Sequence, residues 1–522
     1  MGPMSATGAP TSLSHRQVLL AFSAMMLATL LAALDQTVVA TALPQIVTDL
    51  HGFSELSWVV SAFLVAATVT VPLYGKLSDL YGRRRLFVIS ISIFLLGSAL
   101  CGAAQSMDQL IAFRGLQGLG AGGLLPLAQA AIADLFSPRE RGRYQGYIGS
   151  MWATAAVAGP LLGGSLTDAA SWRWIFYINL PLGAVALVVV LRTMRAQTTV
   201  RAHTIDYAGA AVLSAAITGL LLACTWGGTT YPWGSVEVLT TGIGGLVLAG
   251  VFIAIERRVE EPLLPLALFR GRVLSVSTAA GFVVGAILFA VSIYVPVFSQ
   301  GVQEVSATSS GVILIPFSLG WVAAATATGQ LISRTGRYRV FPIVGSVFIL
   351  GGLGLLTRLG EGTPPAAVAG ILVITGVGMG MTFQPYIIAT QNAVAVSNLG
   401  IATATIQFFR SMGGSLAVAA LGTLLANRLA TELEARLGAA GATRVDTDRL
   451  LGGSAGVPGG LPAGVQAALS DALHVVFVAS VPLGLVALLL ALALPEVPLR
   501  TWSGNEEASS GEPEPEREPA AV

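Results

Sequence analysis

Long apolar stretches, separated by short polar segments, recur along almost the whole chain. Fourteen of them approach the roughly 20 residues that an α-helix needs to cross the hydrocarbon core of a bilayer. The predicted helices span 18–42, 55–75, 86–105, 109–132, 145–168, 174–192, 207–226, 237–256, 273–299, 308–332, 340–358, 365–389, 402–426 and 473–495. The pattern therefore predicts an all-α integral membrane protein with fourteen transmembrane helices. Because the number is even, both termini should lie on one side of the membrane.

Arginine marks every second loop of this pattern. These loops hold arginines within 83–85, 139–143, 257–258 and 334–339, whereas the short loops between them hold almost none. Lys and Arg are enriched in the cytoplasmic loops of membrane proteins. We therefore predict a multi-pass protein of the plasma membrane with both termini in the cytoplasm.

Two short segments are repeated in the same order along the chain. GKLSDLYGRRR at 75–85 recurs as GQLISRTGRYR at 329–339, and GLGAGGLLP at 118–126 has a looser counterpart, GVGMGMTFQP, at 376–385. Parallel six-helix repeats around a central site are one way in which secondary transporters are built. The predicted parts are a cytoplasmic N-terminus (1–17), an N-terminal six-helix bundle (18–192), two inserted linker helices (207–256), a C-terminal six-helix bundle (273–495) with an outside loop (427–472), and a disordered, Glu- and Pro-rich cytoplasmic tail (496–522).

Composition excludes several classes of function. Only 11% of the residues are charged and 54% are hydrophobic, whereas a soluble domain carries about 25% charged residues. The net charge of +1 argues against a nucleic-acid partner. Cys101 and Cys224 lie far apart in apolar stretches and suit neither a metal site nor a disulfide. The sequence shows no metal-ligand cluster and no nucleophile–base set, so we predict that the protein is not an enzyme. We also expect it to function as a monomer, with membrane lipids and a small hydrophobic substrate as its partners.

Two charges lie deep in the predicted spans of the first half, Asp35 in the first helix and Arg114 in the fourth. Ionisable groups inside a membrane are costly and by default mark function. The two helices run in opposite directions and the residues lie at matching depths, so we predict an ion pair. Because an adjacent Arg lowers the pKa of a carboxyl group while desolvation raises it, the expected role is proton coupling. The alternative is a pair that only holds the helices together, although the repeat has Leu372 in place of Arg114.

Three neutral polar residues near this pair are candidates for lining a substrate cavity: Gln36, Thr37 and Gln117. Ordinary hydrogen bonds between helices are the alternative for them. A proton is the only coupling ion that we expect, and no cofactor is predicted.

The segment 75–85 concentrates charge between two apolar helices. Gly75 and Gly82 would allow a tight turn, and Asp79 could accept hydrogen bonds from the N-terminal amides of the following helix. Its predicted charge partners are arginines of this loop and the next one: Arg83, Arg141 and Arg143. Such a cluster would hold the cytoplasmic ends of the helices together in one state and release them in another. Simple anchoring of the topology by positive charge is the alternative.

The fifth predicted helix contains AGPLLGG at 158–164. Proline removes a backbone hydrogen bond and glycine removes side-chain bulk, so these residues predict a segment that can bend: Gly159, Pro160, Gly163 and Gly164. A packing kink without a role in gating is the alternative.

Arg410 is the only charge deep in the second half. It could meet a lipid phosphate, line the cavity or pair with an acidic loop residue, and the sequence leaves these alternatives open.

With these residues in place, the chain resembles the major facilitator superfamily, and within it the fourteen-helix drug:proton antiporters. The similarity covers nearly the whole chain. The motifs that carry it are LDQTVVATALPQI (34–46), GKLSDLYGRRR (75–85), RGLQGLGAGG (114–123), AGPLLGG (158–164) and SWRWIFYINLPLG (171–183). The resemblance assigns Asp35 and Arg114 to proton coupling, and AGPLLGG to exporters rather than importers.

The resemblance implies a proton-coupled antiporter that exports lipophilic drugs by alternating access. Some members that export divalent cationic drugs carry an extra acidic residue in helix 10, but 308–332 has none. Monovalent cations, zwitterions or neutral amphiphiles are therefore the expected substrates. A dedicated exporter of a lipid, siderophore or self-made antibiotic is the alternative with the same fold. A nutrient importer and a non-transporting sensor fit the motifs less well.

Overall fold

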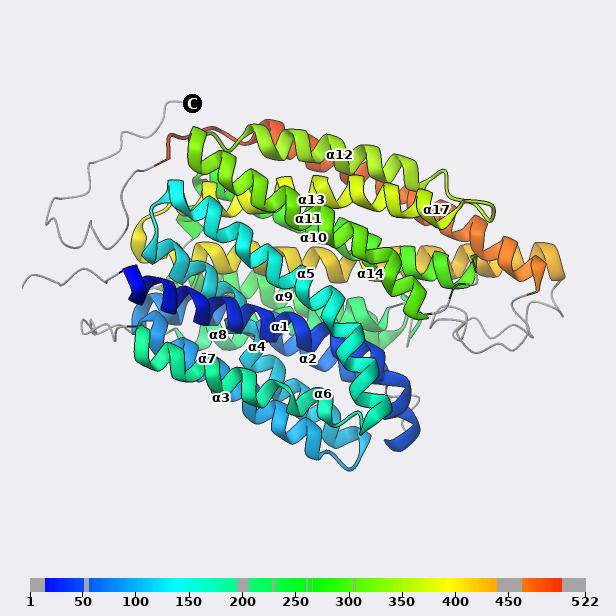
Figure 1. The fold of residues 1–522 in the computed structure, drawn as a ribbon, viewed down its shortest axis with the longest axis horizontal. Coiled ribbons are helices and arrows are strands. Elements are labelled where there is room, and N and C mark those ends of the chain that lie inside the picture. The colour runs from blue at the N-terminus through cyan, green and yellow to red at the C-terminus, as the bar shows by residue number, and fades with distance from the viewer. Residues whose placement is uncertain are drawn as a thin grey trace, which may run out of the picture.

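The computed structural model describes residues 15–50, 56–194, 206–227, 231–259, 262–264, 266–303, 305, 307–438 and 462–499. The first half contains α1 (His15–Leu50), α2 (Leu56–Tyr81), α3 (Arg83–Ala103), α4 (Met107–Leu135), α5 (Pro138–Ala169), α6 (Trp174–Tyr177) and α7 (Asn179–Thr193). Next come α8 (Tyr207–Trp226) and α9 (Val236–Glu256). The second half contains α10 (Arg272–Gly301), α11 (Ala307–Thr335), α12 (Val340–Leu356), α13 (Pro365–Ala393), α14 (Leu399–Leu437) and α17 (Ala463–Ala493). Figure 1 shows their arrangement.

Each of the fourteen predicted helices is present, so the all-α fold class is confirmed. The sixth is divided into α6 and α7, and the predicted loop 427–472 begins later, because α14 continues as a helix to Leu437. Within the described residues, eleven helices are long and apolar enough to span a membrane, and α8 and α12 contain shorter apolar cores. The N-terminus before residue 15 and the tail after residue 499 lie outside the described residues.

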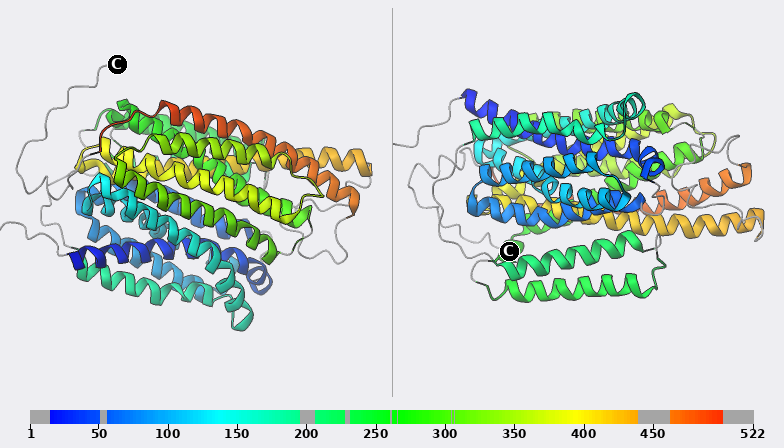
Figure 2. Two further views of the ribbon diagram at one scale, coloured as in Figure 1. Left: turned by 45° about the horizontal axis from the view of Figure 1, so that its top comes forward. Right: turned by 90° about the horizontal axis from the view of Figure 1, so that it is seen from below.

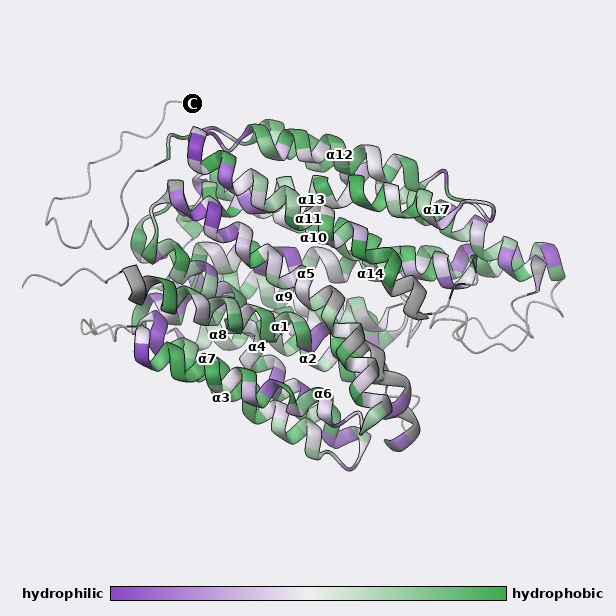
Figure 3. Cartoon of the chain, viewed as in Figure 1, coloured by the Kyte–Doolittle hydropathy of each residue, from purple (hydrophilic) through white to green (hydrophobic). Residues whose placement is uncertain are grey.

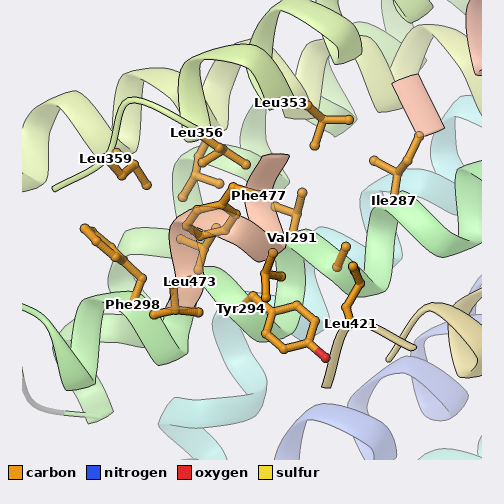
Figure 4. Close-up of a cluster of buried hydrophobic side chains, with 14 of the residues drawn as sticks. Ile287, Val291, Tyr294, Phe298, Leu353, Leu356, Leu359, Leu421, Leu473 and Phe477 are labelled. Atoms are coloured by element: carbon orange, nitrogen blue, oxygen red, sulfur yellow. The ribbon is translucent and has the colours of Figure 1, made fainter. Parts of the chain in front are cut away.

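Apolar side chains hold each half together. In the second half, α10, α12 and α17 share a buried core that includes Tyr294, Phe298, Leu356 and Phe477 (Figure 4). Two further apolar clusters lie among the helices of the first half. Hydrophilic residues are concentrated toward the ends of the helices (Figure 3), as expected for a bundle whose middle faces lipid.

Helices α8 and α9 lie together as a pair beside the main bundle (Figure 2, right). The pair packs on α2 of the first half and α14 of the second half. Leu213, Ile217 and Phe252 of the pair join Val71 and Phe408 in one apolar cluster. The two additional helices therefore cover one of the seams between the halves.

We call the end of the bundle that holds the α2–α3, α4–α5 and α11–α12 junctions the arginine-rich end, and the other the distal end. At the α2–α3 junction Gly82 has a φ of 87°, and its counterpart in the repeat, Gly336, has a φ of 71°. Left-handed backbone of this kind favours glycine. The predicted turn at Gly82 is therefore confirmed.

The prediction for Gly75 is wrong, because this residue lies inside α2 and not in a turn. A Cβ atom at Gly75 would lie 2.9 Å from the carbonyl oxygen of Gly400 in α14. Gly329, its counterpart in the repeat, crosses α5 in the same way, and a Cβ atom at Gly142 would lie 2.5 Å from the oxygen of Gly329. The repeated glycine therefore marks the two places where the halves cross most closely, α2 with α14 and α5 with α11.

Candidate functional site

Asp35 and Arg114 form the centre of a buried polar network. The Arg114 guanidinium donates from Nη1 to Asp35 Oδ2 at 2.7 Å. Asp35 is 1% exposed and Arg114 is 2% exposed. The predicted ion pair between α1 and α4 is therefore present.

Three neutral side chains complete the network. Gln117 donates from Nε2 to Asp35 Oδ1 at 2.7 Å and accepts from Arg114 Nη1 at 2.7 Å. Asn179, the first residue of α7, donates to the same Asp35 oxygen at 3.1 Å and to Ser98 Oγ at 3.0 Å. Asp35 therefore accepts hydrogen bonds from three side chains on two helices other than its own.

The surroundings of this network exclude water. Arg114 lies over the Phe63 ring, with 4.1 Å between its Cζ atom and the ring centroid, and it also donates from Nε to the carbonyl oxygen of Val59. Ser98 donates to the carbonyl oxygen of Phe176 at 2.9 Å. Hydrogen bonds between buried polar groups are strong in such surroundings, and an unpaired member is costly.

Protonation of Asp35 would change this network directly. An ionised carboxylate only accepts hydrogen bonds, whereas a protonated one also donates and accepts less well. At least one of the hydrogen bonds from Arg114, Gln117 and Asn179 to Asp35 would then weaken. A single proton can thus alter how α1, α4 and α7 pack.

The three candidates for a substrate cavity lie in different surroundings. Gln36 is exposed, whereas Gln117 is fully buried inside the network. Thr37 donates to the carbonyl oxygen of Ala155 in α5 at 3.0 Å. A Cβ atom at Gly159 would lie 2.6 Å from Thr37 Cβ, so this glycine lets α5 approach α1.

The other residues of AGPLLGG are less fully described. Gly163 is buried in α5, and Pro160 and Gly164 lie within the same helix, but their surroundings are outside the described part. The bend expected at this segment stays a prediction.

Asp79 binds a helix N-terminus, but not the predicted one. Its two carboxylate oxygens accept from the backbone amides of Gly400 and Ile401, each at 3.0 Å, at the start of α14. The prediction named the helix that follows Asp79 in sequence, and that part is wrong. An anion at a helix N-terminus is stabilised by the unpaired amides and the helix dipole. The contact therefore links the first half to the second half.

Arg83 holds this carboxylate in place, as predicted. It lies 2.5 Å from Asp79, and it also pairs at 2.9 Å with Asp134 of α4, which was not among the predicted residues. Arg141 instead donates to the carbonyl oxygens of Phe136 and Ala133, and Arg143 donates to the hydroxyl of Tyr147. These contacts differ from the predicted pairing of Arg141 and Arg143 with Asp79. We call Asp79, Arg83, Gly400 and Ile401 the latch.

Polar contacts deeper in the bundle also join the halves. Gln407 of α14 donates to Gln129 Oε1 of α4 at 2.8 Å. Gln391 of α13 donates to the backbone oxygen of Gln129 and to Thr403. These glutamines were not predicted, although their position in apolar stretches was a visible signal.

Arg410 follows Gln407 by three residues in α14, and its contact is of a different kind. Its Cζ atom is 4.6 Å from the centroid of the Phe383 ring in α13. Among the described residues, no group of three or more His, Cys, Asp or Glu side chains could hold a metal ion.

The comparisons with known proteins agree with this architecture. The family model of the Major Facilitator Superfamily matches residues 25–418. An uncharacterized MFS-type transporter of Mycobacterium tuberculosis is 38% identical over 507 residues, covering 95% of this chain and 73% of that protein. The multidrug transporter protein MdtP of Bacillus subtilis is 37% identical over 408 residues, covering 78% and 75%.

One solved structure extends the comparison to the fold. The crystal structure of the human organic anion transporter MFSD10 superimposes with a TM-score of 0.59 at 16% identity, covering 90% of this chain and 99% of that one. At this identity the likeness concerns the fold alone. The chain belongs to the Major Facilitator Superfamily.

Proposed function

We propose that the protein is a proton-coupled antiporter that exports lipophilic cationic, zwitterionic or neutral drugs across the plasma membrane. The observation that carries the proposal is the buried carboxylate of Asp35, which is held by Arg114, Gln117 and Asn179. The relatives named for multidrug transport support the direction and the substrate class. Ionisable groups inside a membrane are energetically costly, so their presence by default marks a functional role.

The proposed cycle alternates between two states. With the arginine-rich end in the cytoplasm, the latch and the glycine crossings keep that end closed, so the carrier faces outward. A proton from outside reaches Asp35, weakens substrate binding and loosens the network around Arg114. The halves then rock, the arginine-rich end opens, and the proton leaves to the cytoplasm as the next substrate binds. One proton entering yields roughly 2.3 kcal/mol per 100 mV of membrane potential.

The test is substrate-dependent proton flux in energised inverted vesicles. We expect lipophilic substrates to dissipate the pH gradient in vesicles with the wild-type protein, and the Asp35→Asn variant to lose this response. Asn keeps the shape of Asp and can still accept from Arg114, but it cannot carry a proton.

The matched control is Asp108→Asn, the same chemical change at an exposed residue in the first turn of α4. It should transport as the wild type does. Full proton-coupled efflux by a well-folded Asp35→Asn protein would refute the assigned role. A wild type that responds to none of the drugs would instead favour the dedicated exporter of a lipid, siderophore or self-made antibiotic.

A further inference from the structure

Arg410 is a cation deep in α14, and no acidic side chain among the described residues pairs with it. It lies eleven residues after the start of α14, which is about 16 Å along the helix at about 1.5 Å per residue. The predicted span 402–426 places Arg410 eight residues inside the membrane segment, well within a hydrocarbon core roughly 30 Å thick. The sequence has no Asp or Glu in the central part of α10–α14 or α17. In the part of the chain that the structure describes, the contact of its guanidinium is with the Phe383 ring.

The deep arginine of the first half has different partners from those of Arg410. Arg114 has Asp35, Gln117 and the Val59 carbonyl as partners, so its charge is neutralised within the bundle. Arg410 remains partly exposed, and its guanidinium carries five N–H donors. An uncompensated charge at this depth is costly. A group from outside the protein could supply the missing negative charge.

Helix periodicity shows where Arg410 lies relative to the first half. Gln407 is one turn before Arg410, so the two residues share a face of α14, and Gln407 reaches Gln129 of α4. Arg410 is therefore one turn farther toward the distal end than this contact between the halves.

A similar relation holds on α13. Gln391 reaches the backbone oxygen of Gln129, and Gln384 lies two turns closer to the distal end on the same face. Among the described residues, Gln384 Oε1 is buried without a hydrogen-bond donor. Arg410 on α14 and Gln384 on α13 thus have hydrogen-bonding groups without a partner among the described residues. Both lie one or two turns nearer the distal end than the contacts of Gln407 and Gln391 that join the halves.

We propose that Arg410, supported by Phe383, binds the anionic group of an amphiphilic substrate. A guanidinium binds a carboxylate, sulfonate or phosphate through two parallel hydrogen bonds. An aromatic ring stacked against the guanidinium fixes the orientation of its plane. The inference rests on the proposed export function; among the proposed substrates it favours zwitterionic ones, and it adds anionic amphiphiles to them. Phe383 and Ile406 are themselves buried, so the partly exposed side chain of Arg410 makes the contact with such a molecule.

The test is an equilibrium binding measurement, which does not depend on proton coupling. Dansyl-labelled dodecanoate and its methyl ester differ by one negative charge at nearly the same shape. We would dialyse both against the full-length protein in phosphatidylcholine nanodiscs and subtract the binding to empty nanodiscs. We expect the wild type to prefer the carboxylate about tenfold, Arg410→Gln to lose that preference, and Arg410→Lys to keep part of it.

The control is Arg337→Gln, which removes one positive charge at an exposed position of the same half. It should keep the wild-type preference. An unchanged preference in a monodisperse Arg410→Gln protein would overturn the proposal.

Adding phosphatidylglycerol identifies the source of the anion, because competition that depends on Arg410 would assign the site to a lipid headgroup. Loss of proton-coupled flux with retained anion preference would refute antiport while leaving this site standing.

Discussion

At the scale of single residues, the network around Asp35 relies on neutral partners as much as on the arginine. Asn179 and Gln117 donate to one carboxylate oxygen of Asp35, and Arg114 donates to the other, so both oxygens have donors. The arginine was predictable, because a charge inside a membrane needs an opposite charge. Asn179 and Ser98 were not, because neutral polar residues are common in membrane helices and only the fold shows which of them share a depth.

Asn179→Asp tests this network through its pH dependence. The change places a second carboxylate where the amide nitrogen now lies 3.1 Å from Asp35 Oδ1. Two carboxylates so close repel each other when both are charged, so the pair should share a proton more readily than Asp35 alone holds one. We expect the pH of half-maximal transport to move up by about one unit or more, measured as efflux against external pH. Asn427→Asp, at an exposed position of α14, should leave the profile unchanged, and an unshifted profile in Asn179→Asp would contradict the network.

At the scale of elements, close helix crossings explain what the repeated motif does. The position of Gly75 and Gly329 in the repeat was visible in the sequence, but their role was not, because the partners Gly400 and Gly142 are distant in the chain. The fourteen helices could be predicted, since the length of an apolar stretch is a local property. The partner of Asp79 could not, since a helix N-terminus from the other half supplies the amides.

Gly329→Ala should separate α5 from α11. The added methyl group would collide with the backbone oxygen of Gly142, and overpacking of this kind costs about 1–3 kcal/mol. We expect a lower thermal midpoint, measured by the fluorescence of the purified protein. Gly354→Ala in α12 is the control, because nothing lies within 4 Å of its Cβ position and helix propensity favours alanine. Equal midpoints for the two variants would be inconsistent with a tight crossing.

At the scale of the whole molecule, the halves are joined mainly toward one end. A Cβ atom would lie 2.5 Å from the facing helix at Gly142, 3.0 Å at Gly146 and 3.6 Å at Gly149, so α5 and α11 separate toward the distal end. The latch and the Gln407–Gln129 contact lie on the closed side. The conformation is therefore closed at the arginine-rich end.

Asp79→Asn should shift this conformation. Removing the charge weakens the bonds to the N-terminus of α14 by about 0.5–2 kcal/mol, which changes the ratio of the two states roughly 2- to 30-fold. Spin labels at the exposed positions 85 and 337 would report the distance between the halves at the arginine-rich end. We expect a larger population of long distances in Asp79→Asn than in the wild type or Asp108→Asn. Identical distance distributions would show that the latch does not control the closed state.

The residues of the latch differ in how readily a mutation can disrupt it. Its donors are the backbone amides of Gly400 and Ile401, and every amino acid except proline offers the same group. Side-chain changes at Ile401 therefore leave the attraction in place, whereas a single base change at codon 79 can abolish it. Genetic screens for faster or slower variants should accordingly recover changes at Asp79, and also at Gly400, where a Cβ atom would lie 2.6 Å from Asp79 Oδ1, but rarely at Ile401.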